Sequence, residues 1–441
     1  MFNIFNCNLL RNIIFLANVF VVFFTEYIYF LFFKDYMCCI NRLTTRLASL
    51  NILYVKIFQA FALNNCLIDE KTNQELVKFT DNSPWTSRDI DYIILFNIIG
   101  ENNLITKNGF EIPINSGMIS LVFKAYDEND TPVIIKLKRN NIEDKLNEAI
   151  DNLLFFIRIL SFIPFVHKYK FSELINKNIE IIRHQTNFLE EVDNMTRIKE
   201  NCRLLEYIKI PQAKREVTEK YPNCILMEFI EGIKINEIRK DDFENFAKQV
   251  MKFGFITSIV HGFTHGDLHS GNILFIKDND KKYPYKIGVI DFGIVYEIDE
   301  NFKSELFCIL TELFYEEPRN TSIKLLNSGL IEPPNIFDQI PKKDYENIIN
   351  ILTEIVEDCI DTSKKSNQIQ IYKFILKFKE YLSNSEISDM GITLSNNFIK
   401  LQLVFAMAHG ITFTLCNNQF FGLADKVINE LFHTHFLFEN K

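Results

Sequence analysis

Two short polar motifs carry the residues whose types and spacing suit chemistry on a phosphate group. In the first, Phe263-Thr-His-Gly-Asp-Leu-His-Ser-Gly-Asn-Ile-Leu-Phe275, Asp267 and Asn272 lie five residues apart on a tight, glycine-containing loop. In the second, Val289-Ile-Asp-Phe-Gly293, Asp291 follows an apolar run that is typical of a strand. In phosphoryl transfer one carboxylate orients the attacking hydroxyl, while an amide oxygen and a second carboxylate hold Mg²⁺ against the phosphates. We therefore expect Asp267 to be catalytic and Asn272 and Asp291 to be metal ligands.

The combination of these motifs is more specific than either part. A DFG tripeptide alone is too short to be specific, and two acids in a surface turn are common. An HGDxHxGN loop followed by a β-run that ends in DFG is much rarer. This order corresponds to the catalytic loop and the metal-binding motif of protein kinases, in which the loop usually begins with HRD.

The bulk composition predicts a globular chain. Hydrophobic residues make up 47% and charged residues 24% of it, the net charge is −9, and no Lys/Arg-rich block stands out. Nucleic acid is therefore not expected as a partner, because neutralising its phosphates needs clustered cations. The nine cysteines form no CxxC pair, which favours reduced intracellular thiols over a disulfide framework or a zinc site.

A predicted β-hairpin precedes the two motifs. Residues 112–125 alternate in polarity around Ser116 and Gly117, residues 127–132 have turn composition, and Val133–Lys138 is a second β-run that contains Lys136. This is the layout of a nucleotide-covering hairpin followed by a lysine that pairs with the phosphates. We expect Ser116 and Gly117 to contact the nucleotide and Lys136 to serve both binding and catalysis.

The remaining elements are mostly predicted to be helical. Helices are expected in residues 34–84 and 142–203, and strands at Ile208–Pro211 and Cys224–Ile230. Residues 228–232 follow the second of these strands, so Glu228 is expected in a hinge over an adenine site. After Asn236 the pattern is helical throughout, apart from the catalytic loop and the strand pair around DFG.

An apolar run from Ile13 to Phe33 has the length of a membrane span, but it contains Glu26. A carboxylate near the middle of a span is costly. A helix on the membrane surface and a helix buried in the protein are the alternatives. Only Arg11 precedes the run, whereas Lys34, Arg42 and Arg46 follow it, an asymmetry that favours a cytosolic C-terminal side.

In this order the motifs resemble those of the UbiB/aarF-domain (ADCK-type) atypical kinases, a family linked to ubiquinone biosynthesis and lipid homeostasis. The family's HGDxHPGN corresponds to residues 265–272, with Ser270 in place of the proline. Its ExD motif corresponds to Glu191-Val-Asp193, its lysine strand to residues 132–136, and its nucleotide loop to residues 116–125. Its KxGQ signature appears as Lys56-Ile-Phe-Gln59, with Phe58 in place of the glycine.

The resemblance implies an α+β, protein-kinase-like bilobal fold with a helical N-terminal extension. The implied domains are residues 1–34 (a hydrophobic segment), 35–110 (the KxGQ-like extension), 111–232 (the N-lobe) and 233–441 (the mostly helical C-lobe). The implied cofactors are ATP and Mg²⁺, and Lys56, Gln59, Glu191 and Asp193 are expected near the nucleotide. The acidic residue expected six positions after Glu191 is replaced by Arg197, so the partner of Lys136 stays open between Glu191, Glu200 and neither.

Three functions remain in competition. The first is a UbiB-like kinase or ATPase that uses Mg-ATP on a lipid or another small molecule in lipid- or quinone-related metabolism, not on proteins. The second is a nucleotide-binding pseudokinase, which the changes at Phe58 and Arg197 motivate. The third is a small-molecule phosphotransferase of the aminoglycoside or choline kinase type, which lacks the helix with Lys56 and Gln59. The N-terminal segment is expected to associate the protein with a membrane, with the kinase-like domain on the cytosolic side.

Overall fold

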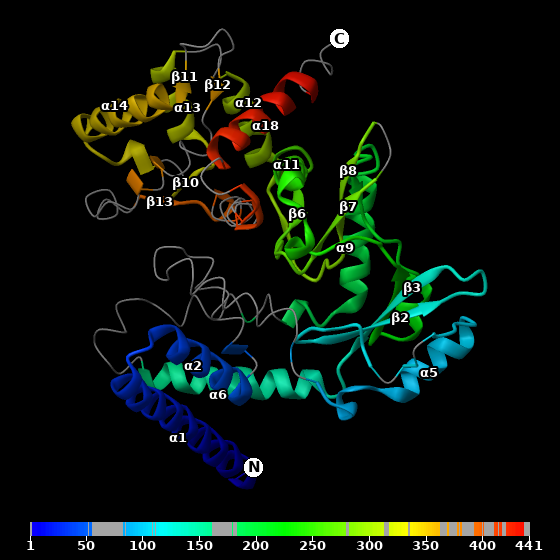
Figure 1. Ribbon diagram of the computed structural model, residues 1–441. Helices are drawn as coiled ribbons and strands as arrows, with labels where there is room; N and C mark the ends of the chain where they lie inside the picture. Colours follow the sequence, from blue (N-terminus) through cyan, green and yellow to red (C-terminus); the bar gives the residue numbers. More distant parts are fainter. Residues whose placement is uncertain are drawn as a thin grey trace. The chain divides into compact units, whose positions relative to one another are not determined.

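Figure 1 shows the computed structural model of the chain, coloured from blue at the N-terminus to red at the C-terminus. It describes residues 2–51, 53–54, 83, 85–107, 109–110, 112–160, 179, 183–278, 282–312, 317–333, 336–361, 368–369, 377–378, 380–381, 392–398, 400, 410–412, 414–416 and 420–435. The chain divides into two compact units. The first consists of Met1–Asp193 and Gln212–Phe229, and the second of Asn194–Pro211 and Ile230–Lys441.

A four-stranded antiparallel sheet forms the centre of the first unit. Its strands lie in the order β1 (Asn115–Ser116), β2 (Ser120–Tyr126), β3 (Pro132–Lys138) and β5 (Cys224–Glu228). The β2–β3 hairpin closes through Asp127, whose carboxylate accepts hydrogen bonds from the backbone N–H groups of Asn129 and Thr131. The register places Lys136 between Val122 of β2 and Ile225 of β5, in the middle of the sheet.

The two faces of this sheet differ because successive residues of a strand point to opposite sides. On one face Ile135 and Leu137 are fully buried in an apolar core. Helices α5 (Tyr92–Glu101) and α10 (Arg215–Lys220) contribute Leu95, Ile98 and Val217 to the same core. Lys136 lies between Ile135 and Leu137 in β3, so its side chain points to the opposite face.

Three long helices accompany the sheet in the first unit, namely α1 (Phe2–Phe33), α2 (Tyr36–Leu50) and α6 (Ile142–Leu160). The chain reverses between α1 and α2 at Lys34, which has a positive φ of 50°. The Asp35 carboxylate then caps α2 by accepting a hydrogen bond from Cys38 N at 3.0 Å. The helices lie side by side, and their shared core includes Val19 and Val22 of α1 and Leu47 of α2 (Figure 1). The short helix η2 (Ser87–Asp89) precedes α5, and α9 (Phe188–Asn201) begins in the first unit and ends in the second.

Two small sheets position the polar motifs in the second unit. In one, β4 (Ile208–Lys209) pairs parallel with β8 (Tyr285–Val289), which pairs antiparallel with β7 (Ile273–Lys277). In the other, β6 (Phe263–His265) pairs antiparallel with β9 (Val295–Glu297). Residues 266–272 therefore join β6 to β7, and residues 290–294 join β8 to β9. Both motif loops connect the same two sheets, which keeps them close together.

Helices make up most of the rest of the second unit. They are η3 (Ile235–Glu237), η4 (Lys240–Asp242), α11 (Phe243–Phe255), α12 (Glu300–Glu312), α13 (Pro318–Asn327), η6 (Ile336–Asp338), α14 (Lys342–Cys359) and α18 (Phe420–His435). A π-helical turn, η5 (Ile256–Val260), continues α11 toward β6. Two-residue strands form two further pairs, β10 (Ile331–Glu332) with β13 (Thr393–Leu394), and β11 (Ile360–Asp361) with β12 (Gln368–Ile369).

The α+β class and the helices that precede the sheet are confirmed. Two local expectations differ from the structure. The strand at Ile208 pairs with β8 of the second unit and not with the hairpin sheet, because α9 leads the chain out of the first unit before β4. The C-terminal part also contains β9 and the pairs β10–β13 and β11–β12, where only helix was expected. These strands have two or three residues each, too few to show a period of two.

Candidate active site

The first unit contains a buried ion pair. Lys136 Nζ lies 2.6 Å from Glu191 Oε1, and the two side chains are 9% and 1% exposed. Burying two charges is tolerated only when they compensate each other, so this geometry commits Lys136 to Glu191. The Phe188 ring, one turn earlier on α9, lies 5.6 Å from the Lys136 ammonium and adds a cation–π contact.

The other acidic candidates lie elsewhere. Glu200, near the end of α9, forms an exposed ion pair with Arg203, which follows the helix. Asp193 is half-exposed and pairs with Arg215. Arg197, which replaces the expected acid, lies 2.6 Å from Glu297 and stacks over the Phe263 ring at 3.9 Å. Of the alternatives for Lys136, the structure therefore selects Glu191.

The side chain of Arg139 stabilises the turn that contains Ser116 and Gly117. Nothing in the sequence indicated this role. Arg139 Nη2 donates to Ser116 Oγ at 2.7 Å and to the Gly117 carbonyl at 2.8 Å. Ser116 Oγ in turn donates to the Ser83 carbonyl at 2.6 Å. The Ser116 hydroxyl is thus part of the scaffold of the turn. Its role toward a nucleotide stays a prediction.

Glu228 ends β5, where its carboxylate accepts a hydrogen bond from Gln212 N at 2.8 Å. Its own N–H donates to the Gln212 carbonyl at 3.0 Å. This reciprocal contact fixes the backbone at the start of the expected hinge. The expected contact of Glu228 with adenine stays a prediction.

His265 connects the catalytic loop to the DFG segment in the second unit. Its ring is 1% exposed, and burial lowers its pKa below the ordinary value, with the carboxylates of Asp291 and Asp267 opposing the shift. The neutral ring therefore has one donor and one acceptor nitrogen. Nδ1 accepts from Asp267 N at 3.0 Å, so Nε2–H donates to the Asp291 carbonyl at 2.5 Å. One imidazole thus positions the backbone of both acidic residues.

Gly266 allows this close approach. A Cβ at this position would lie 2.7 Å from Ile294 Cγ2 and 3.2 Å from the Tyr296 ring, both on the DFG side. The Gly266 N–H donates to the Ile294 carbonyl at 2.8 Å. The glycine of HGD is therefore required by the proximity of the DFG backbone.

The expected metal ligands lie at adjacent strand ends. Asn272 precedes β7 and Asp291 follows β8, and the Ile290 N–H donates to the Asn272 carbonyl at 3.1 Å. Asn272 Nδ2 donates to the Asp267 carbonyl at 3.0 Å, and the Asp291 carboxylate accepts from Gly293 N at 3.0 Å. The set of one carboxylate and one amide oxygen fits Mg²⁺, which takes hard oxygen ligands and completes its shell with water and phosphate.

Asp267 itself is partly exposed, with 19% of its side chain accessible, and it lies 4.0 Å from the His269 ring. Its position beside Asn272 suits a carboxylate that receives a proton from a hydroxyl group or a water molecule. When bound, Mg²⁺ supplies neutralisation of the charge on the phosphates. The roles of Asp267 as a base and of Asn272 and Asp291 as metal ligands stay predictions.

Two further residues support this arrangement and were missed by the sequence analysis. Asn194 of α9 donates to the Phe292 carbonyl of DFG at 3.2 Å. Thr264 of β6 is buried and shares a hydrogen bond of 2.8 Å with Thr257 in the π-helical turn. Neither has a distinctive sequence signal, because Asn and Thr occur in many structural roles. Lys56, Phe58 and Gln59 of the KxGQ-like segment lie outside the described residues.

A comparison with protein-family models places the motifs described above within one known domain family. A family model described as "ABC1 atypical kinase-like domain" matches residues 105–324. This range includes Lys136, Glu191, Asp267, Asn272 and Asp291. The match agrees with the kinase-like fold and with the resemblance inferred from the motifs.

Curated relatives carry related names. The probable serine/threonine-protein kinase abkB of Dictyostelium discoideum is 23% identical over 333 residues, which are 70% of this chain and 47% of the relative. The probable protein kinase UbiB of Actinobacillus pleuropneumoniae is 23% identical over 312 residues, 67% and 56% of the two chains. This chain thus spans about half the length of these relatives. A solved structure of Rv3197 from Mycobacterium tuberculosis with erythromycin has a TM-score of 0.46, 17% identity, and coverage of 84% and 90%.

We expect the Lys136–Glu191 pair to be strongly coupled. Lys136→Met or Glu191→Leu alone should each lower the free energy of unfolding by about 3–5 kcal/mol, because each leaves one buried charge without its partner. The double variant should lose clearly less free energy of unfolding than the two single variants lose together. Denaturant unfolding measures all three, and Glu200→Gln on the same helix is the control, expected within about 1 kcal/mol of the wild type. Additive losses would contradict the pairing.

The neutral state of His265 predicts a pH dependence. Its pKa is lowered in the folded protein and near 6.5 in the unfolded chain, so the unfolded state takes up the proton first as pH falls. The stability contributed by the neutral ring should be fully present above pH ~6.5 and should be lost as the pH falls below that value toward the lowered folded-state pKa. In His265→Gln this decrease should be smaller, whereas His184→Gln, which removes a surface histidine, should keep it. Denaturant unfolding at a series of pH values measures the free energy of unfolding of the wild type and of both variants. If this free energy falls equally with pH in all three proteins, His265 is not a neutral buried residue.

Proposed function

We propose that this chain, whose residues 105–324 belong to the ABC1 atypical kinase-like family, binds Mg-ATP and transfers or hydrolyses its γ-phosphoryl group. The observation that carries the proposal is the link made by His265 between the backbones of Asp267 and Asp291. This link requires the catalytic loop and DFG to adopt one geometry together. A surface turn with two acids has no need of such a link.

Each polar residue has a defined role in the proposed reaction. Lys136, held by Glu191, pairs with the α- and β-phosphates. Asn272 and Asp291 hold Mg²⁺ through their side-chain oxygens. Asp267 accepts the proton of the attacking hydroxyl or water as the bond to the γ-phosphorus forms and ADP leaves. Ser116, Gly117, Glu228 and Asp193 are proposed to contribute nucleotide contacts from the first unit.

The pairing of Lys136 reduces the case for a pseudokinase. Arg197 suggested that the acidic partner of the lysine had been lost, but Glu191 provides it at 2.6 Å. The feature expected to exclude the small-molecule phosphotransferase alternative is a helix with Lys56 and Gln59, which such enzymes lack. These two residues lie outside the described residues. We retain a lipid-linked or small-molecule acceptor in lipid- or quinone-related metabolism, in keeping with the motif resemblance.

We further propose that the protein works at a membrane, with its catalytic residues on the cytosolic side. Leu10–Phe33 is a helical segment long and apolar enough to cross a bilayer, by length and composition. The cysteines at positions 38, 39, 202, 224, 308, 359 and 416 are free thiols. Reduced thiols and a need for ATP both suit the cytosolic side.

The metal assignment predicts the behaviour of Asp291→Asn. A saturating Mg-nucleotide at about 100 times its dissociation constant stabilises a folded protein by about 2.7 kcal/mol. The variant removes a charge from the metal site, so we expect most of this Mg-dependent stabilisation to disappear. Thermal shift with ATP and Mg²⁺ measures it, and Asp130→Asn, in an exposed turn, should respond like the wild type. A full shift in Asp291→Asn would refute the metal site.

The catalytic assignment predicts a separation of binding from turnover. Asp267→Ala should reduce the rate of ADP formation by about 10²–10⁴-fold, which is typical for the loss of a general base. Its thermal stabilisation by Mg-ATP should stay close to that of the wild type. The assay uses purified full-length protein with and without anionic lipid and a quinone-like phenol. Unchanged turnover in the variant would favour a role in binding over catalysis.

A further inference from the structure

Helix α1 has two different faces along its length. On the inner face, Phe15, Val19, Val22 and Glu26 are all buried and follow one another at helical spacing. On the outer face the large apolar side chains are exposed, with Phe20 at 70% and Phe24 at 54%. The other exposed members of this outer face are Leu10, Ile13, Ile14, Val21, Phe23, Tyr27, Ile28, Leu31 and Phe32.

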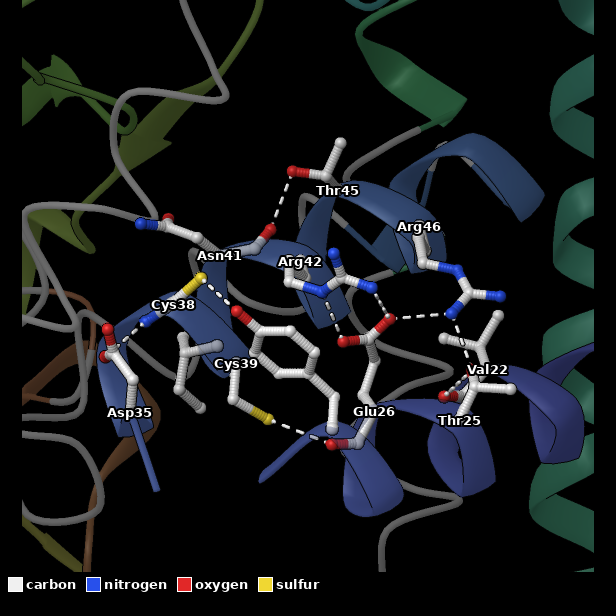
Figure 2. A network of polar contacts seen from close by, with 12 residues as sticks. Val22, Thr25, Glu26, Asp35, Cys38, Cys39, Asn41, Arg42, Thr45 and Arg46 are labelled. Atoms are coloured by element: carbon white, nitrogen blue, oxygen red, sulfur yellow. Dashed lines mark hydrogen bonds and ion pairs between the residues drawn. The ribbon is translucent and has the colours of Figure 1, made fainter. Parts of the chain in front are cut away.

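Glu26 is the polar anchor of the inner face. Its side chain is 1% exposed, and it accepts hydrogen bonds from Arg42 Nε at 2.8 Å and from Arg46 Nη1 at 2.6 Å (Figure 2). Arg46 also donates to Thr25 Oγ1, one residue earlier on α1. Figure 2 shows both arginines of α2 pointing at this one carboxylate. In the sequence, Glu26 counted against a membrane span because a buried carboxylate is costly there. In the structure, it is the residue that fixes α1 to α2.

The inner face is also held near the other end of the helix. Arg11 Nε lies 3.3 Å from Glu148 Oε1 of α6. Between the two polar contacts, Phe15 and Val22 pack in a core that includes Leu47 of α2. The contacts from Arg11 to Glu26 extend over about 22 Å at 1.5 Å per residue, most of the hydrocarbon thickness of a bilayer.

A transmembrane orientation is incompatible with these contacts. If α1 crossed the bilayer, α2 would have to enter the hydrocarbon with it, together with Arg42 and Arg46. Helix α6 would have to enter as well, together with Glu148. Charged side chains in that environment are expensive. Arg42 and Arg46 are also two of the three cations that favoured a cytosolic C-terminal side in the sequence, and both pair with Glu26.

We propose instead that α1 lies in the plane of a bilayer surface, with its outer face in the lipid and its inner face on α2 and α6. This inference rests on the membrane association proposed above and is independent of the nucleotide chemistry. It assigns the outer face of α1 as a membrane-binding surface.

The chemistry of the outer face points to lipid as the occupant. From Ile13 to Phe33 its exposed residues include no charged side chain, and Asn18 and Tyr27 are the exposed polar ones. Protein interfaces carry a polar rim and roughly one hydrogen bond per 100–200 Å². A hydrocarbon surface needs neither. The exposed Lys34 at the end of the helix provides an ammonium group for lipid phosphates, beside Asp35, which caps α2.

A measurement of depth tests the orientation. Phe20 and Leu31 lie on the same outer face, about 16 Å apart along the helix axis. We expect a fluorescent amino acid at either position of the full-length chain to be quenched equally by brominated lipids in phosphatidylcholine–phosphatidylglycerol vesicles. A spanning helix would place the two positions at depths about 16 Å apart. Unequal quenching, or no quenching at either position, overturns the proposal.

A matched pair of variants tests the surface. Phe20→Gln combined with Phe24→Gln should weaken vesicle flotation by about tenfold or more per ring, whereas Phe96→Gln, an exposed ring on α5, should not change it. Both variants should keep the wild-type melting temperature and Mg-ATP shift, so a failure here is distinct from a failure of the nucleotide site. Flotation that is unchanged in the double variant overturns the proposal. So does a wild type that ignores vesicles but forms a dimer through these rings.

Discussion

The buried pair of Lys136 and Glu191 is the constraint on which the first unit depends. The Lys136 side chain is only 9% exposed, and an ammonium group buried without a carboxylate would cost several kcal/mol. One face of β3 is closed by the apolar core around Ile135 and Leu137, so the charge has to be met on the other face. Helix α9 meets it there with Glu191, which lies 55 residues further along the chain. The sheet, its register and the start of α9 are thus all required by one contact.

The second unit depends on a comparable constraint at His265. A buried ring that stays neutral can link two segments only if one supplies a donor and the other an acceptor. The Asp267 N–H and the Asp291 carbonyl meet this requirement. Gly266 makes it sterically possible, since any Cβ there would overlap Ile294. His265 and Gly266 of the HGDxHxGN motif therefore act as structure, whereas Asp267 and Asn272 of the same motif are proposed to act in the chemistry.

Site residues that lie close together in the sequence could be predicted from their motifs. Residues that reach the site from distant parts of the chain could not. Asp267, Asn272 and Asp291 are recognisable because their spacing is local, and the hairpin before Lys136 has a clear period of two. The ambiguity between Glu191 and Glu200 could not be resolved from the sequence, because both lie on α9 and only the fold shows which one faces β3. Arg139 had no signal at all, since its role depends on the carbonyl of Gly117, more than twenty residues away.

The same distinction explains why the N-terminal helix was the least certain element in the sequence. Hydropathy counts the apolar residues of α1 but cannot assign them to faces that have different partners. Glu26 lowers the hydropathy of the segment and so argues against a membrane span. In the structure, however, its negative charge is paired with Arg42 and Arg46 of α2. Once the carboxylate is assigned to α2, Asn18 and Tyr27 are the exposed polar residues that remain between Ile13 and Phe33. What is left outside is an uncharged aromatic surface on a helix that is fixed along one side, and such a surface suits the boundary of a bilayer better than its interior.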